Sequence, residues 1–274
     1  MKLKLGISPC PNDTYIYEAL VTGQMKSEFD WDVTFADVQT LNEMVKRGEL
    51  DVAKVSCGVV PQVLDAYQVL SCGGAIGYSC GPLLLASGIP QAENPQGASA
   101  FDLSRLVVLP GEDTTAALIF RFWASRELPE KPQIEYALFD AVYRSLRNQE
   151  FRQGVVIHEH RFTWKRDGLT LIQDLGDYWE SVTKIPVPLG CTLMRKSFSS
   201  DLVNAVESEI RQSIDIARAR KQIITDFIRK KAQIDEDTVM EKHIHTFVTD
   251  FSYDINKEGR KALQNLFEVS AKTL

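Results

Sequence analysis

The chain lacks the patterns that most readily reveal export, membranes or disulfide bonds. It contains no apolar run long enough to span a bilayer, and its first residues alternate like a strand instead of forming a secretory signal. The five cysteines are odd in number and irregularly spaced, with no C-x-x-C pair, which fits free thiols better than a disulfide framework. We therefore expect a cytoplasmic protein without a membrane partner.

Motifs for common cofactors are also missing. No G-x-G-x-x-G, G-x-x-x-x-G-K-[ST] or G-x-S-x-G element occurs, which excludes the usual dinucleotide, P-loop and α/β-hydrolase interpretations. The net charge of −6 disfavours nucleic acid, which requires a basic face. The histidines form two H-x-H pairs, His158/His160 and His243/His245, but no cysteine pair or nearby carboxylate at ligand spacing supports a metal, and the second pair falls in a predicted helix. We expect no cofactor, no metal and no nucleic-acid partner.

Short apolar strands alternate with helical patterns, which is typical of an α/β fold built from βαβ units. Polar segments follow four of the predicted strands, at residues 3–7, 51–55, 106–109 and 154–157. Ligands of open α/β sheets bind beyond the carboxyl ends of the strands, so we expect the site at these four junctions. Residues 88–100 are predicted to form an exposed loop, and the last third, from a helix start near Ser199, is predicted to be helical and to pack on the first lobe.

Thr114 and Thr115 follow a predicted strand and a glycine loop, where a helix should begin. The unpaired N–H groups and the dipole of a helix start favour an anion, and the hydroxyls add two donors. A threonine that only caps the helix is the simpler interpretation, and spacing alone favours it.

The segment at residues 8–14 allows the same two interpretations. Asn12, Asp13 or Thr14 could cap a helix expected from about Tyr15, whereas Ser8 and Thr14 on a loop stiffened by two prolines are compatible with ligand binding. Neither interpretation is favoured by the residues themselves.

His158 follows an apolar run at residues 155–157, so it should lie where a buried strand emerges. Imidazole is the side chain whose ordinary pKa lets it take up a proton near neutral pH, which makes His158 a candidate general base. A histidine satisfied by a backbone carbonyl is the alternative.

At these junctions the sequence resembles the 1,4-dihydroxy-6-naphthoate synthases of the futalosine route to menaquinone. The resemblance runs through nearly the whole chain, and its most specific blocks are S-P-C-P-N-D-T at residues 8–14 and H-E-x-R-F-T at residues 158–163. Further matching segments lie at residues 37–42, 54–56, 110–115, 188–190 and 243–248.

The resemblance implies an α/β fold of the type II periplasmic-binding-protein kind, in which two lobes, joined by two crossing strands, close on a central ligand cleft. Lobe 1 would comprise residues 1–103 plus 193–274, and lobe 2 residues 104–192. The family's reaction converts cyclic dehypoxanthine futalosine to 1,4-dihydroxy-6-naphthoate and dihydroxyacetone, a carbon–carbon lyase step without a redox cofactor.

Carried over residue by residue, the family's proton acceptor falls on His158, and its substrate contacts fall on Lys54, Val55 and Ser56 and on Thr114 and Thr115. The full set of candidate residues for binding a small-molecule carboxylate adds four from the two specific blocks: Ser8, Asn12, Thr14 and Arg161. Two alternatives are kept: chorismate dehydratase of the same pathway, and a non-catalytic small-molecule-binding protein.

Overall fold

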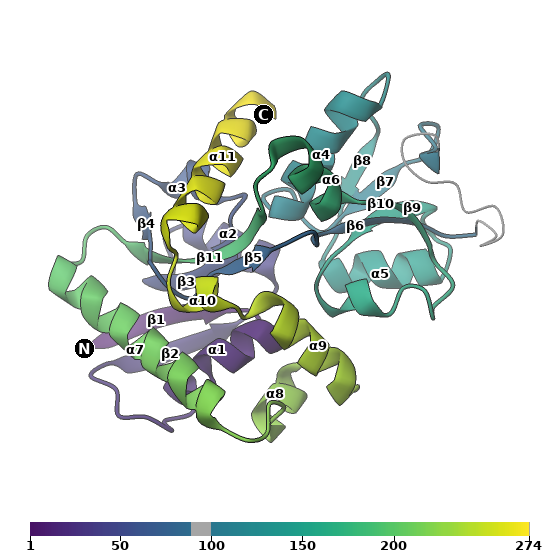
Figure 1. The fold of residues 1–274 in the computed structure, drawn as a ribbon. Coiled ribbons are helices and arrows are strands. Elements are labelled where there is room, and N and C mark those ends of the chain that lie inside the picture. The colour runs from purple at the N-terminus through teal and green to yellow at the C-terminus, as the bar shows by residue number, and fades with distance from the viewer. Residues whose placement is uncertain (89–99, 274) are drawn as a thin grey trace.

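The computed structural model describes residues 1–88 and 100–273, which form two β-sheets covered by helices (Figure 1). The predicted loop at residues 88–100 therefore lies, except for its two end residues, outside the described part of the chain. In that part no helix is both long enough and apolar enough to cross a membrane.

The first sheet has the strand order β2-β1-β3-β11-β4, and β5 pairs with β11 beside this path. Strand β1 is parallel to both of its neighbours, whereas β11 is antiparallel to β3. Its strands are β1 (Lys2–Ile7), β2 (Asp30–Phe35), β3 (Val52–Ser56), β4 (Tyr67–Val69), β5 (Ala75–Gly77) and β11 (Val187–Arg195).

The second sheet has the order β10-β6-β9-β7-β8. Strands β7, β8 and β9 are parallel, and β6 is antiparallel to both β9 and β10. Its strands are β6 (Leu83–Ala86), β7 (Val107–Leu109), β8 (Ile134–Tyr136), β9 (Gln153–Val156) and β10 (Thr170–Asp174).

The helices follow the strands and then fill the last third of the chain. They are α1 (Pro11–Val21), α2 (Val38–Lys46), α3 (Val60–Val63), α4 (Thr115–Glu127), α5 (Phe139–Arg147), the 3₁₀ helix η2 (His158–Phe162), α6 (Leu175–Thr183), α7 (Ser200–Ala219), α8 (Asp226–Lys231), α9 (Asp237–Phe247), α10 (Asp250–Tyr253) and α11 (Lys257–Thr273).

The first sheet with its helices is called lobe 1 below, and the second sheet with its helices lobe 2. The lobe boundaries at 103/104 and 192/193 stay a prediction, but strand pairing differs from them in two places. Strand β6, predicted in lobe 1, hydrogen-bonds β9 and β10 of the second sheet. The first residues of β11, predicted in lobe 2, pair with β5 and β3 of the first sheet. The chain therefore crosses between the sheets at residues 78–82 and again at 184–186.

The helical tail follows the predicted pattern in part. Ser199 caps α7 by accepting a hydrogen bond from the Leu202 amide, and the spaced apolar residues of α7 pack against α1 in lobe 1, as expected. Helix α11, however, contacts α4 of lobe 2 as well as β11 and α3, because Leu263 and Leu266 enter a core shared by both lobes.

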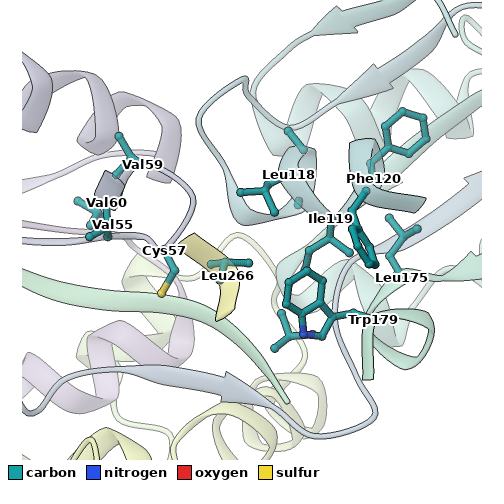
Figure 2. Close-up of a cluster of buried hydrophobic side chains, with 14 of the residues drawn as sticks. Val55, Cys57, Val59, Val60, Leu118, Ile119, Phe120, Leu175, Trp179 and Leu266 are labelled. Atoms are coloured by element: carbon teal, nitrogen blue, oxygen red, sulfur yellow. The ribbon is translucent and has the colours of Figure 1, made fainter. Parts of the chain in front are cut away.

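This shared core is one continuous cluster of buried side chains. Figure 2 shows part of it, with Val55 and Cys57 from lobe 1, Leu175 and Trp179 from lobe 2, and Leu266 of α11 between them. Removal of such apolar surface from water stabilises the fold by about 25 cal/mol per Å². The two lobes are therefore joined by packing as well as by crossing segments.

Candidate active site

The four predicted junctions meet at one cavity of about 100 Å³ between the lobes. From the predicted set the cavity is lined by Ser8, Asn12, Lys54, Val55, Ser56, Thr114, Thr115, His158 and Arg161. Thr14 is the exception. Its hydroxyl bonds the carbonyl oxygens of Cys10 and Pro11 inside α1, and the residue does not line the cavity.

The loop before α1 differs from the expectation that a polar side chain caps this helix. Helix α1 begins at Pro11, with Cys10 at the N-cap and no side-chain cap. Proline suits the first helical position because its missing N–H would be unpaired there anyway. The start near Tyr15 and the capping roles of Asn12 and Asp13 are therefore wrong, and both side chains serve the cavity wall instead.

Asp13 is the polar centre of this wall. Its carboxylate accepts hydrogen bonds from Ser8 Oγ at 2.8 Å and Asn12 Nδ2 at 2.8 Å, and it lies 3.4 Å from Lys54 Nζ. All four side chains are buried, and a buried charge requires such partners. Asp13 was not among the residues predicted for the site.

Lys54 supplies positive charge at the cavity. Its Nζ donates to the Gly73 carbonyl at 2.9 Å, and with Asp13 this contact uses two of the three ammonium protons. The carbonyl belongs to a bend at Gly73, which has φ +74 and where an added Cβ would lie 2.3 Å from Thr192 Oγ1. The glycine-rich segment 73–77, which its sequence predicts to be a turn, bends only at its start, because Ala75–Gly77 forms strand β5. One ammonium proton remains for a ligand.

Ser56 of lobe 1 and Thr115 of lobe 2 form a direct link between the lobes. Ser56 Oγ accepts from the Thr115 amide at 2.6 Å, and the two hydroxyl oxygens lie 2.9 Å apart. Thr115 Oγ1 also donates to the Leu189 carbonyl at 3.0 Å. The link holds the start of α4 against the end of β3.

Thr114 is the N-cap of α4, as the simpler interpretation predicted. Its Oγ1 accepts from the Ala117 amide at 3.1 Å and donates to the Gly111 carbonyl at 2.9 Å. The hydroxyl proton is therefore engaged within the protein, although the residue lines the cavity.

Arg161 also lines the cavity with its guanidinium engaged. It donates to the Gly81 carbonyl at 2.5 Å and to Asp174 at 2.6 Å. These bonds fix its position beside the first crossing, from β5 to β6.

His158 is the first residue of η2, directly after β9, and not the end of a strand. Its backbone has φ +56, a left-handed conformation that costs a residue with a side chain about 1–3 kcal/mol. Its Nδ1 lies 3.3 Å from Cys10 Sγ in lobe 1, and its Nε2 is buried with no hydrogen-bond partner in the described part of the chain. The backbone-carbonyl alternative is therefore not what the structure shows.

Electrostatics keeps His158 unprotonated. Burial lowers the pKa of His158 to about 3, and the charges of His160 and Lys54 act in the same direction. A neutral imidazole can accept a proton, so the ring is in the form that a general base needs at neutral pH.

His160 is not among the residues that line the cavity. Its ring stacks on Tyr143 at 3.8 Å between centroids and is buried.

Cys10, His158 and Glu159 place one possible ligand atom each within 4.8 Å of one another. The sequence analysis did not anticipate this cluster. Burial raises the pKa of Cys10 well above its ordinary value, which keeps the thiol protonated, and it raises the pKa of Glu159 to about 7.

His243 is the functional candidate that sequence reasoning missed. It comes from α9, lines the cavity and is only 1% exposed. Its Nε2 lies 2.9 Å from Asn12 Oδ1. No local pattern could have revealed this, because the two residues are 231 positions apart.

Comparison with known proteins identifies the family. The family described as menaquinone biosynthesis matches residues 3–272. A relative from Streptomyces coelicolor is 36% identical over 270 residues, which cover 98% of this chain and 93% of the relative. A relative from Thermus thermophilus is 37% identical over 274 residues, which cover 99% of this chain and 95% of the relative. The chain belongs to the menaquinone biosynthesis family. Both relatives are named as 1,4-dihydroxy-6-naphthoate synthases, so this chain is an enzyme of menaquinone biosynthesis with a small-molecule substrate.

Solved structures confirm the fold. A protein of Archaeoglobus fulgidus superimposes with a TM-score of 0.87 at 23% identity, covering 99% of this chain and 97% of that chain. The periplasmic aliphatic sulphonate binding protein of Escherichia coli does so with a TM-score of 0.64 at 10% identity, covering 99% and 87%. Such low identities show the fold alone, which is the predicted two-lobed periplasmic-binding-protein fold.

Proposed function

We propose that this enzyme is a 1,4-dihydroxy-6-naphthoate synthase that cleaves a carbon–carbon bond of cyclic dehypoxanthine futalosine and releases dihydroxyacetone. The observation that carries the proposal is His158, a neutral imidazole in the cavity between the lobes of a member of this family, whose Nε2 has no hydrogen-bond partner among the described residues.

His158 acts as the general base. It removes a substrate proton, the carbon–carbon bond breaks in a retro-aldol-like step, and the electron pair of that bond stays on the ring fragment that becomes aromatic. A positioned base of this kind contributes roughly 10²–10⁴-fold in rate. The closed lobes exclude water and orient the substrate, and the reaction so written needs no redox cofactor.

Lys54 binds the substrate carboxylate through its remaining ammonium proton. It is a buried cation on the cavity wall, whereas the guanidinium of Arg161 is already bonded to Asp174. Thr114, Thr115 and Ser56 shape the opposite wall at the start of α4, where backbone dipoles add favourable potential for an anion. The unpaired cysteines support the cytoplasm as its compartment.

The test is direct turnover. Purified protein without added metal or nucleotide is incubated with cyclic dehypoxanthine futalosine, and both products are followed by chromatography. Formation of 1,4-dihydroxy-6-naphthoate and dihydroxyacetone in equal amounts supports the proposal. Binding without product would favour a solute-binding protein, and turnover of chorismate instead would favour the dehydratase.

A further inference from the structure

His243 faces the same cavity as His158 but comes from a different part of the chain. Their ring centroids lie 6.2 Å apart, and the His243 ring also contacts Phe247 at 4.9 Å between centroids. Helix α9 of the helical tail thus places a second, buried imidazole beside the proposed base.

A chain of hydrogen bonds fixes where the proton of His243 resides. Asp13 is the ion-pair partner of Lys54 and can only accept, so Asn12 must turn its Nδ2 toward it. The Asn12 Oδ1 then faces His243 Nε2 at 2.9 Å and requires a donor. His243 therefore carries its proton on Nε2, and Nδ1 keeps a free lone pair.

Nδ1 is buried and has no hydrogen-bond partner among the described residues. Leaving a buried acceptor unsatisfied costs about 1–3 kcal/mol, and because His243 is one of the residues that line the cavity, a ligand donor could satisfy this acceptor. Burial, reinforced by the charge of His158, lowers the pKa of His243 well below its usual value, so the lone pair is not consumed by a proton.

We propose that His243, held in the Nε2–H form by Asp13 and Asn12, binds the substrate by accepting a hydrogen bond from one of its hydroxyl groups at Nδ1. The inference rests on the proposed function, which supplies a hydroxylated substrate. A carboxylate has no proton to donate and is directed to Lys54 instead. Lys54, which only donates, and His243 Nδ1, which only accepts, thereby distinguish the carboxylate end of the substrate from its hydroxyl end.

A matched pair of substitutions separates this role from a structural one. In His243→Gln the side-chain amide can reach the Nε2 position and donate to Asn12, but the acceptor at Nδ1 is lost. In His243→Asn the amide oxygen can occupy the Nδ1 position, but the donor to Asn12 is lost. Both variants are first compared with the wild type by circular-dichroism melting.

We expect kcat/KM to fall about 3- to 10-fold in His243→Gln, mainly through KM, as for loss of one neutral hydrogen bond, and to fall less in His243→Asn. A larger fall of kcat/KM in His243→Asn than in His243→Gln would show that His243 only supports Asn12. Wild-type kinetics in both variants would show that His243 has no role in binding. Either result overturns the inference.

The tautomer is measured without substrate, so a failure of the proposed function stays distinguishable. With only four histidines in the chain, a long-range ¹H–¹⁵N spectrum of protein labelled at histidine nitrogens resolves each ring, and His243→Gln identifies the His243 signals. We expect a protonated Nε2 and an unprotonated Nδ1 between pH 6 and 8. A proton on Nδ1 would overturn the inference, whereas a wild type without turnover would overturn the proposed function.

Discussion

The Sγ atom of Cys10 lies 3.3 Å from Nδ1 of His158, and this contact joins the loop before α1 in lobe 1 to the start of η2 in lobe 2. For Nε2 to accept a substrate proton, Nδ1 must carry the proton of the neutral ring, so Nδ1–H donates to the Cys10 sulfur, which is a weak acceptor. The proposed base is therefore completed only when the two lobes are together.

Replacement of His158 by asparagine tests the base with the least disturbance of the backbone. Asparagine tolerates the left-handed conformation that His158 adopts, whereas alanine would be strained there. We expect kcat to fall roughly 10²–10⁴-fold while the melting temperature changes little. Turnover is followed by product chromatography.

The matched control is His245→Gln, because His245 lies two residues beyond His243 on the exposed side of α9. This variant should keep wild-type kinetics. Near-full turnover by the His158→Asn enzyme would contradict the assignment of the base.

The cysteines should react slowly and in an order set by burial. Cys10 is 2% exposed and its pKa is raised by burial, so it holds little thiolate at neutral pH. Cys80 is the cysteine of intermediate exposure and should be alkylated first by iodoacetamide, although burial raises its pKa too. Peptide mass spectrometry of briefly treated native protein measures the order, and rapid labelling of Cys10 would show that this thiol is activated.

Glu159 makes stability depend on pH. Burial raises its pKa in the folded protein to about 7, against 4.5 when unfolded. The contribution of Glu159 to the unfolding free energy is therefore fully present below pH 4.5 and is lost as the pH rises through 7. Glu159→Gln has no such dependence, so from pH 4.5 to 8 the unfolding free energy of the variant should rise by about 3 kcal/mol relative to wild type.

Urea unfolding at several pH values measures this difference. His158, His160 and His243 have pKa values lowered by desolvation and act with the opposite sign, since their contribution to stability is lost as the pH falls below 6.5. They are common to both proteins and cancel in the comparison. A difference that stays flat from pH 4.5 to 8 would show that Glu159 is ionised throughout.

Asp113 ties lobe 2 to lobe 1 outside the cavity. Burial alone would raise its pKa, but hydrogen bonds from Gln62, Lys46 and Gln39 lower it, with donor distances of 2.8, 2.9 and 3.3 Å. Asp113→Ala leaves three lobe 1 donors without their acceptor. We expect a loss of about 2 kcal/mol in stability, a melting temperature lower by about 4–8 °C, and a higher KM.

The neighbouring exposed residue offers the control. Glu112→Ala removes the same charge one position away without touching those donors and should behave like wild type in melting and kinetics. Equal effects of the two substitutions would mean that charge, and not the link between lobes, matters.

Sequence patterns located the site because its signals are local. A short apolar strand that ends in polar residues is visible in one window, and all four such junctions reach the cavity. Helix α7 begins at the predicted cap because Ser199 and the apolar spacing agree.

What the sequence could not predict depends on distant contacts. The sequence around Asn12 is compatible with a helix cap, but its amide instead hydrogen-bonds Asp13 and His243. The sheet to which β6 belongs is decided by its partners β9 and β10, since a fully apolar strand fits either sheet. The left-handed backbone at His158 likewise has no signal in its neighbours.

Asp13 contacts Ser8, Asn12 and Lys54 at the same time. Because it orients the Asn12 amide, it also determines which atom of Asn12 faces His243. We therefore expect that Asp13, Asn12 and His243 cannot be substituted independently of one another during evolution. Homologues should retain the Asp13, Asn12 and His243 trio intact or exchange its members together, and a chain that has lost one while keeping the others should have acquired a different substrate preference.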